Sequence, residues 1–552
     1  MSFDGVGKGA AIDRRHFLVG AVGIAGVAAL AGCSPQSSGT PTASTGEPSQ
    51  DSENTASQET LGEPTATYDC DVLVVGTGTA GMAAAVQAVE LGANTMVIEK
   101  VGFVGGQSSS AEVMFGCNSR LQREQNLVYT DYELLTHECE FHNFRVDREL
   151  WNRIIEVSGS SIDWLLDNVE PYGAGFQMVL GGIDAPQVAH MFGSYSDEEG
   201  DWEKGAGISH ALNKVLQANG VEVMTNCEGK QLITEGDRVV GLFAESKEGL
   251  IRINASKGVI LACGGFTGNP DMIVEQGRNA DRMMCRGYAT NVGDGIRMAH
   301  EVGADHRGSM NTQLMGPTMP FESSNDYKYV TAVAVLLGSP LWVNHHGIRF
   351  VKEAGLIYTV TSNAIDMQDD VFTVFDQALV NASQEIETGI ELATYFPPGT
   401  KLDQVQAEID DLLGKGVDYA FTGDTLDELA EAMGVDAANL KASVDRYNEL
   451  CAAGKDEDFG KDPAMLAPIK EGPFYAFRVY NNLLCTGGGV RINDNAQVLR
   501  PGSVPIEGLY CAGQDCDGFM GETYGVNMPG STQGIALCTG RLAASHACGQ
   551  PL

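Results

Sequence analysis

An α/β fold with several domains is the fold class that the sequence predicts, on three observations. The chain has 552 residues, which exceeds one simple core and indicates two or three domains of roughly 100 to 200 residues each. Residues 72–75 form a short apolar run bounded by turn residues, as a buried strand does. An Ala-rich helical stretch at 82–91 and a second apolar strand at 95–98 follow it. A strand, helix and strand in this order are typical of α/β proteins.

The first residues resemble an export signal. Arg14 and Arg15 precede an apolar, Gly/Ala-rich run up to Cys33, as in twin-arginine signals. The run is shorter than the roughly 20 residues that a membrane-spanning helix needs. Because Leu-Ala-Gly-Cys at its end resembles the box at which bacterial lipoproteins are cleaved and acylated, we expect residues 1–33 to direct export. The expected location is the outer face of the cytoplasmic membrane, with a lipid anchor at Cys33; plain cleavage nearby is the alternative.

Residues 34–67 are expected to be a disordered tether. They are rich in Ser, Thr, Pro, Gln and Glu, and such a stretch buries too little apolar surface to offset the entropy of ordering it. Ordered structure is expected to begin at residue 68.

The composition argues against some kinds of site and partner. With 35 basic and 73 acidic residues the net charge is −38, which argues against nucleic acid as a partner. The 13 cysteines include no CxxC pair and no CxxCH haem-attachment site. We therefore predict no metal site, and no standard cysteine spacing supports an iron–sulfur cluster.

A glycine-rich turn, Gly76-Thr77-Gly78-Thr79-Ala80-Gly81, joins the first strand to the helix. The first glycine makes the turn, the second lets the backbone approach a pyrophosphate, and the third lets the helix pack on the strand. The phosphates then lie at the helix amino terminus, where unpaired N–H groups and the helix dipole favour anions. Glu99 ends the second strand about 20 positions later, where it can bind a ribose diol. The unit predicts a dinucleotide site in a Rossmann-like domain.

Four further stretches follow in order: GGQS ending at Ser108, ACGG around Gly264, NVGDGI around Asp294, and GLYCAGQ ending at Gln514. This order resembles that of the fumarate reductase and succinate dehydrogenase flavoprotein superfamily. The resemblance covers most of residues 68–548 and implies FAD, not NAD, as the cofactor. Relatives usually have Glu where this chain has Gln514.

The resemblance also implies a domain plan. In the family a capping domain, inserted between the two halves of the FAD-binding domain, closes over the substrate. Here the halves would be residues 68–308 and 470–552, and the inserted α+β cap would be residues 309–469. VNHHGIRFVKE within the cap is similar to the family's VNxxGxRFxNE element. Residues 425–454 show apolar side chains at helical spacing, which predicts two amphipathic helices.

The family's substrate-binding positions are occupied differently in this chain. Fumarate reductases hold a dicarboxylate with two histidines and two arginines. Gly316 and Cys485 stand where the histidines would be, Tyr358 falls near the proton-donating arginine, and Ala332-Val333 replaces a Thr-Glu pair. A dianion would lose hydrogen bonds to charged groups worth about 1.5 to 3 kcal/mol each, so fumarate and succinate are poor candidates. Tyr358 is a candidate general acid; the alternative is a tyrosine packed in the cap.

The stretch MGETYGVNMPGSTQG near the carboxyl end resembles the MGxTYPGxGxTxG segment of 3-ketosteroid dehydrogenases, a branch with neutral substrates. There a tyrosine hydroxyl and a glycine N–H hold a ketone oxygen, which implies the same roles for Tyr524 and Gly530. Hydride addition to a double bond beside a carbonyl moves negative charge onto that oxygen, and aligned donors stabilise it. Ser531 and Thr532 then begin a helix whose amino terminus, in the family, faces the flavin N1 and C2 carbonyl.

These patterns predict an exported FAD-dependent reductase that transfers hydride from flavin N5 to the activated C=C bond of a neutral enone or unsaturated lactone. Such a substrate would be a steroid, cardenolide or plant-derived compound in anaerobic metabolism. A separate donor, such as a membrane cytochrome, would supply electrons. A 3-ketosteroid dehydrogenase running in the oxidative direction and a non-catalytic flavin electron carrier are the alternatives. The predicted FAD-binding residues are Gly76, Gly78, Thr79, Ala80, Gly81, Glu99, Gly105, Gly106, Gln107, Ser108, Ala262, Gly264, Asp294, Gln514, Ser531 and Thr532.

Overall fold

The computed structural model of the protein describes most of the chain from residue 61 onward. The described residues are 61–111, 113–181, 186–195, 202–204, 207–285, 287–306, 311–320, 326–353, 361–388, 396, 399–521, 524–525 and 528–552. The predicted export signal, most of the predicted tether and the candidate acid Tyr358 lie outside them.

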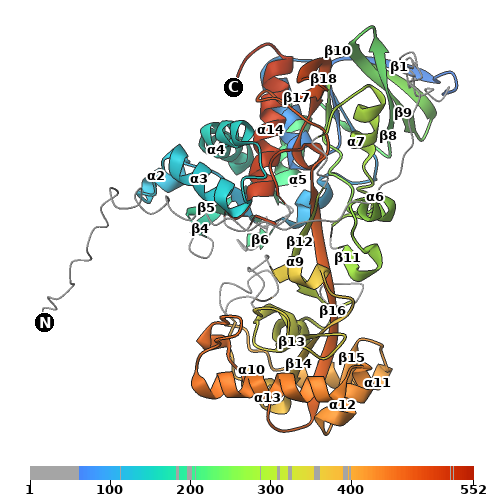
Figure 1. The fold of residues 1–552 in the computed structure, drawn as a ribbon. Helices are drawn as coiled ribbons and strands as arrows, with labels where there is room; N and C mark the ends of the chain where they lie inside the picture. Colours follow the sequence, from blue (N-terminus) through green and yellow to red (C-terminus); the bar gives the residue numbers. More distant parts are fainter. Residues whose placement is uncertain are drawn as a thin grey trace, which may run out of the picture. The chain divides into compact units, whose positions relative to one another are not determined.

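Strands from both ends of the chain build one mixed sheet (Figure 1). β1 (Ala66–Val75) pairs in parallel with β2 (Thr95–Glu99) and with β10 (Gly249–Leu261), and β18 (Val504–Cys511) pairs in parallel with β10. β10 thus lies between the last strand of the chain and the first ones. The described part of this sheet also contains β7 (Val223–Thr225), β8 (Glu228–Glu235), β9 (Arg238–Ser246) and β17 (Gln497–Arg500).

Two helices that pack on this sheet begin close to the ends of its strands. α1 (Thr79–Glu90) and α14 (Ser531–Ala547) pack closely, because a Cβ at Gly540 of α14 would lie 2.2 Å from the Ala80 carbonyl oxygen. Nearly every residue of both helices is buried. The further helices before residue 302 are α2 (Arg120–Glu124), α3 (Asp131–Phe141), α4 (Arg148–Val169), α5 (Gly207–Ala218), α6 (Pro270–Glu275) and α7 (Asp294–Glu301).

A small antiparallel sheet lies beside α14. It consists of β3 (Val113–Phe115), β4 (Ala174–Gly181), β5 (Gln187–Tyr195) and β6 (Trp202–Lys204). The Phe115 N–H donates to the Gly530 carbonyl oxygen at 2.9 Å, which ties this sheet to the start of α14.

One long strand, β16 (Phe474–Gly487), belongs to two regions of the fold (Figure 1). Its first half pairs with β14 (Val371–Asp376) and β15 (Ala420–Gly423), and its second half pairs with β11 (Met283–Cys285) and β12 (Asn311–Thr318). β13 (Leu341–Asn344) completes the sheet next to β14. The domain boundary at residue 470 stays a prediction, and the strand that begins just after it is shared.

Helices cover the sheet around β13, β14 and β15. α12 (Leu426–Met433) and α13 (Ala437–Ala453) are the two amphipathic helices predicted at residues 425–454. Each helix buries its apolar face and exposes its polar face. Thr425 and Glu428 form a capping box that fixes the start of α12. The others are α8 (Lys328–Thr331), α9 (Thr361–Asp366), α10 (Gln377–Gln384) and α11 (Val405–Lys415). Across the described residues we find no helix with the length and apolar character to cross a membrane.

Candidate active site

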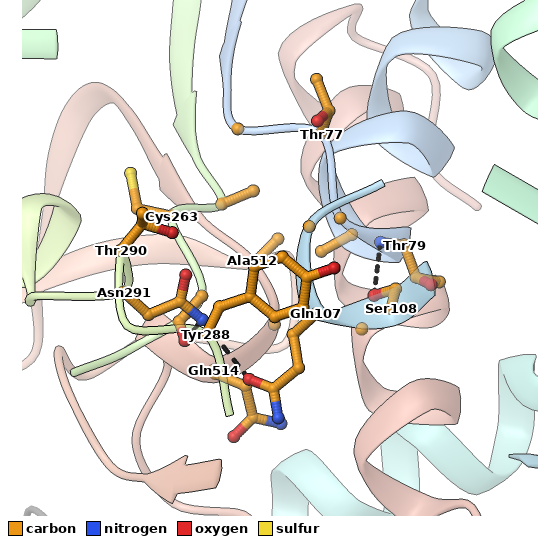
Figure 2. Close-up of a pocket in the computed structure, with 18 of the residues that line it drawn as sticks. Thr77, Thr79, Gln107, Ser108, Cys263, Tyr288, Thr290, Asn291, Ala512 and Gln514 are labelled. Atoms are coloured by element: carbon orange, nitrogen blue, oxygen red, sulfur yellow. Dashed lines mark hydrogen bonds between the residues drawn. The ribbon is translucent and has the colours of Figure 1, made fainter. Parts of the chain in front are cut away.

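A cavity of about 330 Å³ opens where four parallel strands end (Figure 2). Residues at or just after the ends of β1, β2, β10 and β18 line it, and so do the first turns of α1 and α14. In α/β folds ligands bind at this edge of the sheet. All of the predicted FAD-binding residues except Gly81, Gly105 and Ser531 lie on its wall.

The turn before α1 has the shape that a pyrophosphate requires. Gly76 has φ +103, and a Cβ on it would lie 2.3 Å from the Ala262 carbonyl oxygen. A Cβ on Gly78 would meet only Ser108 Oγ, at 3.4 Å, so this position is open toward the cavity. Ser108 Oγ accepts the Thr79 N–H at 3.0 Å (Figure 2). The amino terminus of α1 therefore faces the cavity with room for phosphate.

The three predicted residues off the wall have supporting positions. A Cβ on Gly81 would lie 2.0 Å from the Gly76 carbonyl oxygen, so Gly81 permits the close packing of helix on turn. The Gly105 N–H donates to Thr77 Oγ1 at 3.1 Å. Ser531 Oγ donates to the Gly525 carbonyl oxygen at 3.3 Å, within the segment that carries Tyr524.

Glu99 is buried at the end of β2, and its carboxylate is fixed by the chain. Glu99 Oε2 accepts hydrogen bonds from the Thr77 N–H at 3.1 Å and from Thr77 Oγ1 at 2.6 Å, while Oε1 accepts the Val101 N–H at 3.0 Å. A carboxylate oxygen has two acceptor positions, so Oε1 keeps capacity for a ribose hydroxyl. This arrangement fits the adenosine half of FAD.

Lys100 is a wall residue that the sequence motifs did not single out. Its Nζ lies 2.8 Å from Asp294 Oδ2 and donates to the Thr290 carbonyl oxygen at 3.0 Å. Among the lining residues that the structure describes, Lys100 is the single cationic side chain. It compensates the carboxylate that begins α7.

Asp515 is a second supporting residue that the motifs did not reveal. It is fully buried, and its two carboxylate oxygens accept the N–H groups of Cys263 and Gly265. Burial raises the pKa of Asp515 to about 6, although these two hydrogen bonds favour the ionised form. Asp515 holds the Gly264 turn against the segment that carries Gln514, and the only signal in the sequence was its place next to Gln514.

A bridge of side-chain amides ties the GGQS segment to β16. Gln107 Nε2 donates to the Leu484 carbonyl oxygen. Asn291 Nδ2 lies 3.4 Å from Gln107 Oε1 (Figure 2). Asn291 Nδ2 also donates to the Gly264 carbonyl oxygen at 3.0 Å. The bridge fixes the wall next to Cys485.

Tyr524 and Gly530 both line the cavity. The Tyr524 hydroxyl lies 3.5 Å from Thr532 Oγ1 in the first turn of α14. Burial raises the pKa of Tyr524, and the nearby Cys485 adds to the increase, so the phenol keeps its proton as a hydrogen-bond donor. Gly530 has φ +79, and a Cβ there would lie 2.7 Å from the backbone of Met114 and Phe115. Only glycine fits this close approach.

The positions that the sequence predicts to correspond to the dicarboxylate-binding residues of fumarate reductases carry neutral groups here. Gly316 on β12 has φ +70, and its N–H donates to Ser362 Oγ at 2.7 Å. Cys485 on the neighbouring β16 is buried in the cavity wall, and burial raises its thiol pKa to about 12. Ala332 and Val333 lie in a buried, apolar π-helical turn. No arginine or histidine is among the described residues that line the cavity.

Comparisons with known proteins agree with this geometry. The family model for the FAD binding domain matches residues 71–527. A vinyl phenol reductase from Lactiplantibacillus plantarum is 32% identical over 489 residues, which cover 86% of this chain and 96% of the relative. A urocanate reductase from Eggerthella lenta is 30% identical over 492 residues, covering 87% of this chain and 75% of that protein.

Among solved structures, a 3-ketosteroid Δ1-dehydrogenase from Sterolibacterium denitrificans has a TM-score of 0.72. The identity is 23%, over 87% of this chain and 99% of the other, so this similarity concerns the fold. The predictions of an α/β flavin-binding fold and of FAD are confirmed. The chain belongs to the FAD-binding flavoprotein family that includes these reductases, and it is an FAD-dependent oxidoreductase that acts on carbon–carbon double bonds.

Proposed function

We propose that the protein reduces the activated C=C bond of a neutral substrate whose double bond is conjugated to an oxygen. An enone, an unsaturated lactone and a vinyl-substituted phenol all have this character. The observation that carries the proposal is Tyr524: a protonated phenol on the cavity wall, with Thr532 and Cys485 beside it and no arginine or histidine among the described lining residues.

The chemistry of Tyr524 follows from where charge develops. Bound FAD, once reduced by an electron donor, would supply the hydride. When hydride adds to the β-carbon of an enone or unsaturated lactone, the carbonyl oxygen gains negative charge, and a hydroxyl donor already directed at that oxygen stabilises it. The Gly530 N–H, at the amino terminus of α14, is the proposed second donor. A proton then adds to the α-carbon, which completes the reduction of the C=C bond.

A vinylphenol follows the same logic. Its phenolic oxygen loses a proton and its terminal alkene carbon gains one, which leaves a quinone methide. Hydride addition to the benzylic carbon of that species places the charge on the phenolic oxygen, so the same donors stabilise it. The 32% identity to a vinyl phenol reductase along nearly the whole of that relative supports including this class.

The test is anaerobic reoxidation of the chemically reduced, FAD-loaded protein, followed by flavin absorbance. The panel is 4-vinylphenol, a steroid enone, an unsaturated lactone, a cinnamate, urocanate and fumarate. Rapid reoxidation by one of the first three, with fumarate inert, is the expected result. Reoxidation by fumarate or urocanate alone would show that a carboxylate is recognised after all and would overturn the proposal.

Two alternatives make different predictions for the same protein. A 3-ketosteroid dehydrogenase would need the same donors at Tyr524 and Gly530, and would reduce its own flavin when mixed with a saturated 3-keto steroid. A non-catalytic electron carrier would leave every alkene of the panel unchanged. Product analysis after multiple turnovers separates the three, with reduced methyl viologen as the electron donor for the alkenes and an oxidised dye as the electron acceptor for the saturated steroid.

We also infer that the protein is exported and held at the membrane by a lipid on Cys33, and that a separate donor such as a membrane cytochrome supplies electrons. Arg14-Arg15 and the Leu-Ala-Gly-Cys box support the export part. Cell fractionation tests it: a Lys-Lys replacement of the arginine pair should retain the protein inside the cell, and Cys33→Ala should release it from the membrane. Unchanged fractionation of both variants would contradict the inference.

A further inference from the structure

A buried histidine and glutamate pair lies directly behind the segment that leads to Tyr524. Glu138 belongs to α3, and His142 is the residue that caps this helix. Both side chains have no exposed surface, and His142 Nε2 lies 3.0 Å from Glu138 Oε1. On the other side of the ring, the Gly521 N–H donates to His142 Nδ1 at 3.2 Å.

These contacts determine which ring nitrogen carries the proton. A backbone N–H can only donate, so His142 Nδ1 must be the unprotonated, accepting nitrogen. The proton of the neutral ring then lies on Nε2, from which it is donated to the Glu138 carboxylate. Glu138 thereby selects the tautomer that can receive the Gly521 N–H.

Three contacts fix the segment of residues 518–521 to α3 and α4. The Asp147 N–H donates to the Gly518 carbonyl oxygen at 2.6 Å, and Trp151 Nε1 donates to the Phe519 carbonyl oxygen at 2.8 Å. The contact at His142 is the last of the three before Tyr524. A Cβ on Gly521 would lie 2.9 Å from His142 Nδ1, so this approach depends on glycine.

The far end of the same stretch is fixed independently. The Gly530 carbonyl oxygen accepts the Phe115 N–H at 2.9 Å, and the backbone of β3 lies against Gly530 too closely for any side chain. Tyr524 thus lies between two attachments, one to the helical pair α3 and α4 and one to β3. We infer that a shift at the first attachment would change the position of the phenol relative to the cavity.

We propose that His142, oriented by Glu138, is a positioning residue for Tyr524. It holds the Gly521 N–H and so fixes the chain three residues before the phenol, at the place from which Tyr524 donates to the substrate oxygen. The inference rests on the proposed role of Tyr524. Its physical basis is that placing a reacting or stabilising group wrongly by about 1 Å lowers the rate by up to roughly 100-fold.

Two near-isosteric variants separate the two contacts of the ring. In His142→Asn the amide oxygen can take the place of Nδ1 and accept the Gly521 N–H, whereas in His142→Gln the longer side chain reaches Glu138 instead. We expect His142→Gln to lower kcat by roughly 10- to 100-fold with little change in KM, and His142→Asn to stay within about threefold of the parent. FAD content should be unchanged in both.

A matched control lies on the same helix. His137 of α3 has no hydrogen bond to residues 518–521 among the described contacts, and His137→Asn and His137→Gln should leave kcat unchanged. Equal losses in the two His142 variants, or none in either, would overturn the inference. A loss that follows FAD content would show a role in folding instead and would overturn it as well.

A double-variant measurement keeps this inference apart from the proposed function. If His142 acts through Tyr524, adding His142→Gln to Tyr524→Phe should lower kcat no further than Tyr524→Phe alone does. Additive losses would refute the positioning role while leaving Tyr524 as the donor. Full activity of Tyr524→Phe would instead refute the proposed function.

Discussion

Asp515 accepts the backbone N–H of Cys263 at 2.6 Å, between residues that are 252 positions apart in the chain. The contact joins the turn after β10 to the segment after β18, and both line the cavity. The carboxylate is fully buried, yet it has no cationic partner among the described contacts and depends on backbone N–H groups. A buried carboxylate held in this way makes stability depend on pH.

The sign of that dependence follows from the raised pKa of Asp515. The usual value is 3.8 and the folded value is about 6, so the folded protein binds the proton more tightly than the unfolded chain. Below about pH 4 this contribution stabilises the folded protein by about 3 kcal/mol, and it is lost as pH rises through about 6.

Asp515→Asn removes this titration. We expect the free energy of unfolding of the parent, minus that of Asp515→Asn, to fall as pH rises from about 4 to about 7. Urea unfolding of both proteins at several pH values measures it. Asp515→Asn also loses one of the two oxygens that accept backbone N–H groups. This loss changes the difference in unfolding free energy by a constant amount and does not change its dependence on pH. A flat or rising difference would contradict the prediction.

Tyr524→Phe should lower kcat by roughly 100- to 1,000-fold, because removal of one donor to a developing oxyanion costs about 2.7 to 4 kcal/mol. Steady-state turnover with the best alkene of the panel measures it, and flavin absorbance checks that FAD is retained. Tyr475→Phe is the matched control: its hydroxyl donates to Gln377 Oε1 at 2.6 Å, away from the cavity lining. Equal losses in both variants would show a general effect on stability.

Gly78→Ala should weaken FAD binding without unfolding the protein. The added methyl would meet only Ser108 Oγ, at 3.4 Å, and would occupy the space at the start of α1 where phosphate fits. Gly81→Ala should behave in the opposite way, because its methyl would lie 2.0 Å from the Gly76 carbonyl oxygen and would strain the fold itself. FAD titration and apoprotein unfolding separate the two effects. Loss of apoprotein stability in Gly78→Ala would refute the assignment.

Cys485→His should introduce affinity for a carboxylate at the neutral wall. A protonated imidazole beside Tyr524 can donate to an anionic ligand, and a hydrogen bond to a charged group is worth about 1.5 to 3 kcal/mol. We expect a cinnamate to bind roughly 10- to 100-fold more tightly at pH 6 than to the parent, as measured by perturbation of the flavin spectrum. Cys485→Ser, which adds no charge, is the control. Equal affinity in both variants would show that residue 485 does not face the ligand.

The glycine-rich turn and Glu99 could be predicted from the sequence because their contacts are local or close to local. Gly76, Gly78 and Gly81 act within one turn. Glu99 lies 22 positions after Thr77, at the end of the neighbouring strand β2, and accepts the hydrogen bond of the Thr77 hydroxyl. The order of the later motifs then placed Gln514 and Tyr524 on the same cavity.

Lys100, Asp515 and the Gln107 bridge could not be predicted in this way. Their function depends on partners that meet only in the folded chain: Lys100 with Asp294, Asp515 with Cys263, and Gln107 with the Leu484 carbonyl oxygen. The positive φ of Gly316 is likewise a property of the fold, since glycine adopts that backbone region readily whereas other residues are uncommon there. The role of Tyr358 stays a prediction.

The shared strand β16 has a consequence for how this enzyme could be divided or rebuilt. Its 14 residues span roughly 45 Å at about 3.3 Å per residue, and its end carries Leu484 and Cys485 into the cavity wall. If residues 309–469 were exchanged for the equivalent segment of a relative, the β14 and β15 of that relative would have to pair with the first half of this chain's own β16. A chimaera that keeps β16 together with β13, β14 and β15 from one parent should fold better than one cut at residue 470.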